Sequence, residues 1–290
     1  MPAYLLVEMT ASDTRDALAD TALLDAYRGG NDAALSALLT RHAPSVLRFG
    51  MKMCRDPEDA KDVLQETLLA AARGARDFRG ASALSTWLYT IARSFCIKKR
   101  RGGRVDTEPL DEESAMQLVS QVRPPDEVLA ARELGAALEE AIEALTPPYR
   151  EVLLLRDVEG LSALQVAEVL GVGVDAVKSR LHRARVAVRA RMAPLLAPNV
   201  APRGAECPDV VPMLSGYLEG EIDAKQCAQM DRHVATCERC RADCDSLRRV
   251  LALCKSEARA GTVPPDVQAA VQKALREIGA RPRTSEHEDS

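Results

Sequence analysis

Apolar residues recur at helical spacing through most of this chain, and this pattern constrains its fold more than any other sequence feature. Leu35, Leu38 and Leu39 fall on one helical face, as do Val63, Leu64 and Leu68 in a later segment. Aromatic residues make up only 3% of the chain, and alternating β-branched and aromatic runs, which are typical of strands, are nearly absent. The sequence therefore predicts an all-α protein.

The helical blocks are separated by segments rich in Gly, Pro or acidic residues. A chain of 290 residues is long enough for two or three small domains. The expected divisions are an N-terminal arm (1–19), a first helical domain (20–102), an acidic linker (103–125), a second helical domain (126–193), a second linker (194–205), a cysteine-rich domain (206–258) and a C-terminal tail (259–290). No apolar run approaches the ~18 residues that span a bilayer, so a cytoplasmic protein without membrane contact is expected.

Charge is distributed unevenly, although the net charge is only -4. Residues 19–105 hold 15 Lys and Arg against 9 Asp and Glu, and residues 174–192 hold 6 against 1. The intervening residues 106–126 hold 1 against 6. Two basic blocks on either side of an acidic segment indicate surfaces that bind phosphates, as in nucleic acids.

The second basic block has the pattern of a helix-turn-helix. Ser162 and Gln165 can form a capping box at the start of one helix, and glycines at 171 and 173 permit a sharp turn before the next. In this motif the second helix lies in the major groove of DNA. Its candidate DNA-binding residues are Lys178, Ser179, Arg180, His182, Arg183 and Arg185. The alternative is an amphipathic helix with a solvated basic face.

Residues 174–185 (VDAVKSRLHRAR) resemble the last helix of region 4 in extracytoplasmic-function (group 4) sigma factors of bacterial RNA polymerase. The resemblance implies recognition of the -35 promoter element. Residues 145–152 and 159–162 are also similar to that domain. Residues 20–101 resemble region 2 of the same family, in which residues 56–67 correspond to the helix that binds the polymerase clamp.

That resemblance implies polymerase-binding roles for Asp62, Gln65 and Glu66, which lie at i, i+3 and i+4 and share one helical face. Carboxylates can also serve acid–base catalysis. However, the sequence around them offers no nucleophile, metal signature or Gly-rich phosphate loop, so no enzymatic activity is expected.

Residues 78–93 resemble the part of region 2 that opens the -10 element, and the resemblance implies that residues 74–85 hold a flipped base. A displaced strand also needs cations along its backbone. The candidates are Arg93, Lys98, Lys99 and Arg100. Trp87 can stack on a base or belong to the core, and the core is favoured. Cys54 and Cys96 are interpreted as ordinary buried thiols.

The acidic linker has two interpretations. In the resembled family this segment passes through the RNA-exit path of the polymerase, where carboxylates such as Asp106 and Glu108 would mimic the charge of RNA. A solvated tether would have the same composition, so both interpretations stay open.

Six of the eight cysteines lie in the last third of the chain, where Cys207, His233, Cys237 and Cys240 form the pattern C-x25-H-x3-C-x2-C. Three thiolates and one imidazole suit tetrahedral zinc. The segment resembles the zinc-containing anti-sigma domain, here fused to its sigma factor. Three interpretations remain: a structural zinc site, a regulatory site that responds to oxidation or to another metal, or no metal at all.

The regulatory interpretation depends on the additional thiols of Cys227, Cys244 and Cys254. A thiol near a zinc thiolate permits disulfide formation with loss of metal, and Cys244 adds a soft ligand for copper.

The sequence thus predicts a sigma factor that binds the RNA polymerase core and directs it to -10 and -35 promoter DNA. Its C-terminal domain is expected to contact the sigma domains and to tune them. The alternatives are a helix-turn-helix regulator that does not recruit polymerase, and a metal-storage or redox protein, which would leave residues 20–192 unexplained.

Overall fold

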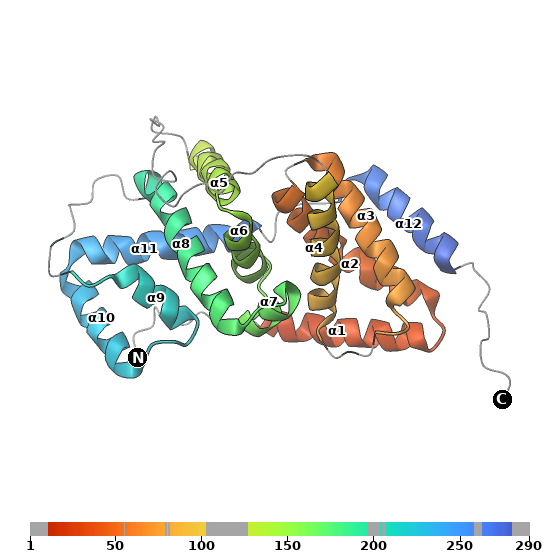
Figure 1. Ribbon diagram of the computed structural model, residues 1–290, viewed down its shortest axis with the longest axis horizontal. Helices are drawn as coiled ribbons and strands as arrows, with labels where there is room; N and C mark the ends of the chain where they lie inside the picture. Colours follow the sequence, from red (N-terminus) through yellow and green to blue (C-terminus); the bar gives the residue numbers. More distant parts are fainter. Residues whose placement is uncertain are drawn as a thin grey trace. The chain divides into compact units, whose positions relative to one another are not determined.

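The computed structural model describes residues 11–54, 56–78, 80, 82–102, 127–196, 204, 207–257 and 263–279. Every secondary-structure element in these ranges is a helix (Figure 1), which confirms the predicted all-α class. The chain divides into two compact units, residues 1–104 with 261–290 and residues 105–260. None of the described helices is long and apolar enough to span a membrane. The acidic linker lies outside the described residues.

The first unit is a helical bundle. Its helices are α1 (Ala11–Arg28), α2 (Asp32–Cys54), α3 (Pro57–Gly74), α4 (Leu84–Gly102) and α12 (Pro265–Gly279). Phe49, Leu64 and Leu88 lie in its core and are almost completely buried. Helix α1 begins at Ala11, within the segment predicted as an N-terminal arm (1–19), and no Gly or Pro interrupts residues 11–28.

Local sequence explains the helix ends in this bundle. The Asp56 side chain accepts hydrogen bonds from the backbone N–H groups of Glu58 and Asp59, and Pro57 occupies the first turn of α3. An N-cap carboxylate and an N-terminal proline both favour a helix start. Helix α1 ends at Arg28, and Gly30, with φ 100°, lies in the turn that follows it.

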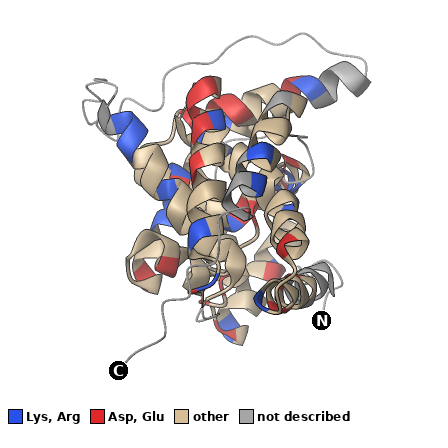
Figure 2. Ribbon diagram, turned by 90° about the vertical axis from the view of Figure 1, so that its right-hand side faces the viewer, with Lys and Arg blue, Asp and Glu red and all other residues tan. Residues whose placement is uncertain are grey.

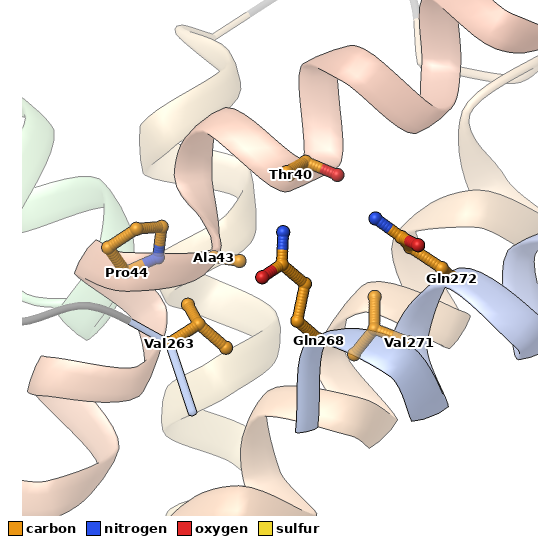
Figure 3. A pocket seen from close by; sticks show the side chains of 7 residues that line it. All are labelled: Thr40, Ala43, Pro44, Val263, Gln268, Val271 and Gln272. Carbon is orange, nitrogen blue, oxygen red and sulfur yellow. The ribbon is translucent and has the colours of Figure 1, made fainter. Parts of the chain in front are cut away.

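Helix α12 lies within residues 259–290, which the sequence predicted as a tail. It packs against α2 and α3 (Figure 1), with Val267 and Val271 buried. Gln268 and Val271 point from α12 toward α2 beside a cavity of about 250 Å³ (Figure 3). The C-terminal segment is therefore part of the first unit.

The second unit contains the helix-turn-helix and the cysteine-rich segment together. Its helices are α5 (Glu127–Glu143), α6 (Pro147–Leu153), the π-helix η2 (Leu154–Val158), α7 (Ala163–Leu170), α8 (Val174–Leu196), α9 (Val210–Leu218), α10 (Ala224–Thr236) and α11 (Glu238–Glu257). Helix α8 packs against α9 and α11. It continues through Pro194 to Leu196, beyond the predicted end of the domain.

The hydrogen bonds of one buried arginine and a small apolar core stabilise this unit. The buried Arg150 side chain donates hydrogen bonds to the carbonyl oxygens of Ile142, in the last turn of α5, and Leu145, just after that helix. The cysteine-rich helices share a core that includes Val210, Leu214 and Leu247, and Val186 of α8 packs against it. Helix α8 therefore belongs to both the helix-turn-helix and the core of the cysteine-rich domain.

Candidate DNA-binding surface and metal centre

The helix-turn-helix has the local geometry that its sequence predicts. The Ser162 hydroxyl accepts from the Gln165 N–H, and the Gln165 side chain accepts from the Ser162 N–H, which forms the predicted capping box. Gly171 ends α7 with φ 67°, a left-handed conformation that favours glycine. These features fix α7 and α8 on either side of a short turn.

One face of α8 is buried through Val177, Leu181, Ala184 and Val188. The candidate DNA-binding residues differ in their exposure. Ser179 and Arg183 are exposed, and Lys178, Arg180 and His182 are half-buried. The Arg183 side chain also donates to the Tyr149 hydroxyl at 3.2 Å.

Arg185 departs from the prediction, because its side chain is buried. It forms a bidentate ion pair with Asp157, with N···O distances of 2.6 and 2.9 Å. A third nitrogen–oxygen contact, of 2.9 Å, joins it to Glu219 of the cysteine-rich domain. Burial lowers the pKa of Arg185, but the charges and hydrogen bonds of Asp157 and Glu219 together raise it above its usual value. In this conformation protein carboxylates occupy the guanidinium of Arg185, and its contact with DNA stays a prediction.

Further ion pairs join the cysteine-rich domain to the basic helices. Arg156 contacts Glu219 at 3.2 Å, Lys178 contacts Glu221 at 3.4 Å, and Arg189 contacts Asp243 at 2.8 Å. No motif in the sequence marked these acidic residues. Only the fold shows these pairs, because their members lie 43 to 63 residues apart along the chain.

His182 lies close to this interface and is only partly accessible. Burial lowers its pKa, while the negative charges of Asp209 and Glu221 act in the opposite direction. Its imidazole therefore favours the neutral form. The acidic groups of the cysteine-rich domain face Lys178 and His182, two of the predicted DNA-binding residues.

In the first unit, Asp62, Gln65 and Glu66 are exposed on α3 and share one helical face, as the sequence predicted. Figure 2 shows that acidic and basic residues alternate along the same helices. Lys99 of α4 contacts Asp62 at 2.7 Å and Asp59 at 3.2 Å, and these hydrogen bonds raise its pKa. Lys99 was predicted to bind DNA, but here it ties α4 to α3.

The other predicted cations of α4 remain at least partly accessible. Arg93 and Arg100 are half-buried, and the exposed Lys98 lies over the Phe95 ring at 5.1 Å. Trp87 is half-buried and stacks on Phe78 with ring centroids 4.9 Å apart. This packing agrees with the favoured core interpretation for one face of its ring.

Cys207, His233, Cys237 and Cys240 come together as one cluster, with their ligand atoms all within 4.8 Å of one another. Cys207 Sγ lies 3.8 Å from Cys237 Sγ, and His233 Nε2 lies 3.2 Å from Cys240 Sγ. Tetrahedral zinc with Zn–S bonds of ~2.3 Å would separate two sulfurs by about 3.8 Å. The donor set therefore fits a tetrahedral metal ion of this kind.

The three additional thiols lie outside this cluster. Cys244 and Cys254 are completely buried in α11, and burial raises the pKa of Cys244 to about 11 and that of Cys254 further. Cys227 is half-buried, and its pKa is raised by desolvation and by Asp231. All three therefore favour the protonated thiol, which is a weak nucleophile and a weak metal ligand.

Comparison with known protein families finds three matches along the chain. Residues 38–104 match the family "Sigma-70 region 2", residues 135–188 match "Sigma-70, region 4", and residues 207–241 match "Putative zinc-finger". The ECF RNA polymerase sigma factor SigM of Mycobacterium tuberculosis is 35% identical over 61% of this chain and 84% of its own. The chain belongs to the extracytoplasmic-function sigma factors.

Other relatives show the same relationship. The RNA polymerase sigma-H factor of Pseudomonas aeruginosa is 30% identical over 61% of this chain and 95% of its own. SigE of Mycolicibacterium smegmatis is 32% identical over 58% of this chain and 66% of its own. Among solved structures, CnrH in complex with the cytosolic domain of CnrY has a TM-score of 0.45 and 27% identity, over 59% of this chain and 96% of that one. In the present chain, a zinc-finger-type, anti-sigma-like domain follows region 4.

Proposed function

We propose that this sigma factor binds the RNA polymerase core and directs it to promoters with -10 and -35 elements, and that its C-terminal domain restrains this activity. Region 2 presents Asp62, Gln65 and Glu66 on an exposed face of α3, where a basic or polar surface of the polymerase can bind them. Region 4 presents Ser179 and Arg183 on the exposed side of α8, which suits contacts with DNA.

The observation that carries the restraint is the set of ion pairs between the C-terminal domain and region 4. Glu221 pairs with Lys178, and Glu219 pairs with both Arg156 and Arg185. DNA affinity depends strongly on pairing of Lys and Arg with phosphates. Carboxylates that already pair with these cations compete with DNA for them, and the domain also covers one side of α8.

Helix α12 supports a second point of restraint, on region 2. It packs against α3, the helix that carries the proposed polymerase-binding residues, and against α2. The C-terminal extension thus contacts both sigma domains of its own chain.

The Cys207, His233, Cys237 and Cys240 cluster is proposed to hold zinc. A bound ion would join the segment before α9 to the α10–α11 junction, and cross-linking of this kind contributes folding free energy to a small domain. Metal loss, oxidation of the ligands or exchange for copper would then loosen the domain that covers α8. This coupling is the proposed basis of regulation by metal or oxidant.

Run-off transcription with purified core polymerase tests both parts of the proposal. The full chain is compared with a chain that lacks residues 200–290, each with zinc, with a chelator, with copper and with peroxide. We expect defined transcripts from both chains, and several-fold more from the truncated chain. Failure of both chains to bind core or to start at a defined site would refute the sigma-factor proposal. Equal activity of both chains under all conditions would refute only the restraint.

A further inference from the structure

Two cysteines of region 2, far from the metal cluster in sequence, lie in direct contact. Cys54 is the last residue of α2, and Cys96 lies in α4, which packs against α2. A hydrogen bond joins their sulfur atoms at 3.3 Å, across 42 residues of sequence. A covalent disulfide measures ~2.05 Å, so this contact is between two thiols. The sequence interpreted both as ordinary buried thiols, and nothing in their spacing predicts the contact.

The two thiols differ in their accessibility. Cys96 is completely buried, whereas Cys54 is half-buried. The hydrogen bond with Cys96 lowers the pKa of Cys54, and the positive charges of Arg100 and Lys99 act in the same direction, while burial and Asp59 oppose them. The thiolate is the reactive form of cysteine. Region 2 therefore combines a partly accessible thiol, whose pKa is lowered, with a second thiol in direct contact with it.

We propose that Cys54 and Cys96 are a peroxide-sensitive pair that forms a reversible disulfide within region 2. The Cys54 thiolate attacks one peroxide oxygen, the O–O bond breaks, and hydroxide leaves and takes up a proton. The product is a sulfenic acid on Cys54. The Cys96 sulfur then attacks the Cys54 sulfur, the S–O bond breaks, and water leaves with the thiol proton. Two thiols and one hydrogen peroxide give one disulfide and two waters.

The position of this pair gives the disulfide a mechanical consequence. Cys54 lies two residues before Asp56, the N-cap of α3, and Cys96 lies one turn before Lys99, which contacts Asp59 and Asp62 of α3. A covalent bond at this point joins the α2–α3 corner to α4. It would restrict motion at the start of the helix that carries Asp62, Gln65 and Glu66.

Mass spectrometry of the zinc-treated full chain tests the proposal. The protein is treated with a few equivalents of hydrogen peroxide, blocked with an alkylating reagent and digested. We expect a peptide pair that joins Cys54 to Cys96 and is two hydrogens lighter than the free peptides, with full reversal by dithiothreitol. We also expect oxidation to raise the thermal midpoint of region 2 by at least about 5 °C, because the bond closes a long loop.

Cys54→Ser and Cys96→Ala should each abolish both the cross-linked peptide and the rise in midpoint, whereas the control Cys227→Ser should preserve them. Zinc release is recorded with a colorimetric chelator, which separates oxidation of the metal cluster from oxidation of region 2. Recovery of Cys54 and Cys96 as alkylated thiols after peroxide, or of Cys54 only as a sulfinic acid, would overturn the proposal. So would cross-links that join either residue mainly to the cysteines of the C-terminal domain.

Discussion

The interface between region 4 and the C-terminal domain depends on a charge cluster whose members balance one another. Arg185 and Arg156 supply two positive charges, and Asp157 and Glu219 supply two negative charges. The Arg185, Asp157 and Glu219 side chains are each at most 6% exposed. A buried ion pair is tolerated only while its partners are complete, since loss of one leaves an uncompensated charge in a medium of low polarity.

Replacement of Glu219 should therefore weaken the whole second unit. We expect Glu219→Gln to lower the free energy of unfolding by about 3 kcal/mol, measured by urea denaturation and circular dichroism. The matched control is Glu221→Gln, since Glu221 is 41% exposed and lies 3.4 Å from Lys178. That change should lower it by less than about 1 kcal/mol. Equal effects of the two substitutions would contradict the assigned role of Glu219.

Asp20 provides a prediction of pH dependence in the first unit. Burial raises its pKa, but hydrogen bonds and positive charge from His42 and Arg41 lower it further, to below the usual value. The unfolded chain therefore binds this proton at a higher pH than the folded chain does. The stabilisation that results is complete above an ordinary Asp pKa of ~3.9 and is lost as the pH falls through the lower folded pKa.

Asp20→Asn should accordingly lower the free energy of unfolding by about 1 to 2 kcal/mol at pH 7, and the difference from the unmodified chain should shrink below pH 4. Urea denaturation at a series of pH values measures this. Asp25→Asn removes an exposed carboxylate that pairs with Arg28 and should change stability by less than about 0.5 kcal/mol. A difference for Asp20→Asn that stays constant with pH would exclude this linkage.

The cluster of Cys207, His233, Cys237 and Cys240 could be predicted from sequence, whereas the ion pairs of Arg185 and Lys99 could not. Four residues of ligand type at chelating spacings form a local chemical pattern. By contrast, Arg183 and Arg185 look equivalent in a basic helix, and only the fold shows that Asp157 and Glu219, 28 and 34 residues away, lie beside Arg185. Lys99 is likewise paired across 37 residues.

At the scale of the helices, those whose ends depend on local chemistry were predicted well. Asp56 and Pro57 start α3, and Ser162 with Gln165 starts α7. Helix α12 was missed because its apolar residues Val267 and Val271 become part of a core only when α2 and α3 are present. The sequence alone predicted a C-terminal tail over residues 259–290.

The turn of the helix-turn-helix contains two glycines with different requirements. Gly171 has φ 67°, whereas Gly173 does not have a positive φ, and at both positions a Cβ atom would have no neighbouring atom within 4 Å. Gly171→Ala should therefore lower the free energy of unfolding by about 1 kcal/mol through backbone strain alone. Gly173→Ala should change it by less than about 0.5 kcal/mol. Urea denaturation of both variants checks this, and a larger cost at Gly173 would contradict the described backbone.

Helix α12 should detach from region 2 when a charge is introduced into its buried face. Val271 is 5% exposed, so Val271→Asp removes ~1.5 to 3 kcal/mol of apolar burial and adds the cost of a buried carboxylate. We expect hydrogen exchange in residues 265–279 to accelerate by at least about tenfold. We also expect affinity for core polymerase to increase.

The control for this experiment is Lys273→Ala, since Lys273 is exposed on the same helix. It should leave both hydrogen exchange and polymerase affinity unchanged. Faster exchange without a change in polymerase affinity would show that α12 stabilises region 2 but does not restrain it.

At the scale of the whole molecule, the C-terminal extension contacts each sigma domain within that domain's own compact unit. The α9–α11 segment packs against α8 of region 4, and α12 packs against α2 and α3 of region 2. Each contact places residues of the extension beside a helix with a proposed binding role, α8 for DNA and α3 for polymerase. Restraint of the whole factor then requires no fixed arrangement of the two units, because each domain has its own contact.

Electrostatics at region 4 gives a measurable consequence of this arrangement. Each Lys or Arg that neutralises a DNA phosphate contributes ~0.9 to the slope of log affinity against log salt concentration. Lys178 is paired with Glu221 in the full chain, and Arg189 is paired with Asp243. A chain that ends at residue 199 should therefore bind a -35 duplex more tightly, with a slope steeper by about 1 to 2, measured by fluorescence anisotropy.

Glu221→Gln in the full chain frees Lys178 alone, so its slope should become steeper by at most about 1. Identical slopes for all three proteins would mean that these carboxylates do not compete with phosphate, and the charge-based restraint of region 4 would have to be abandoned.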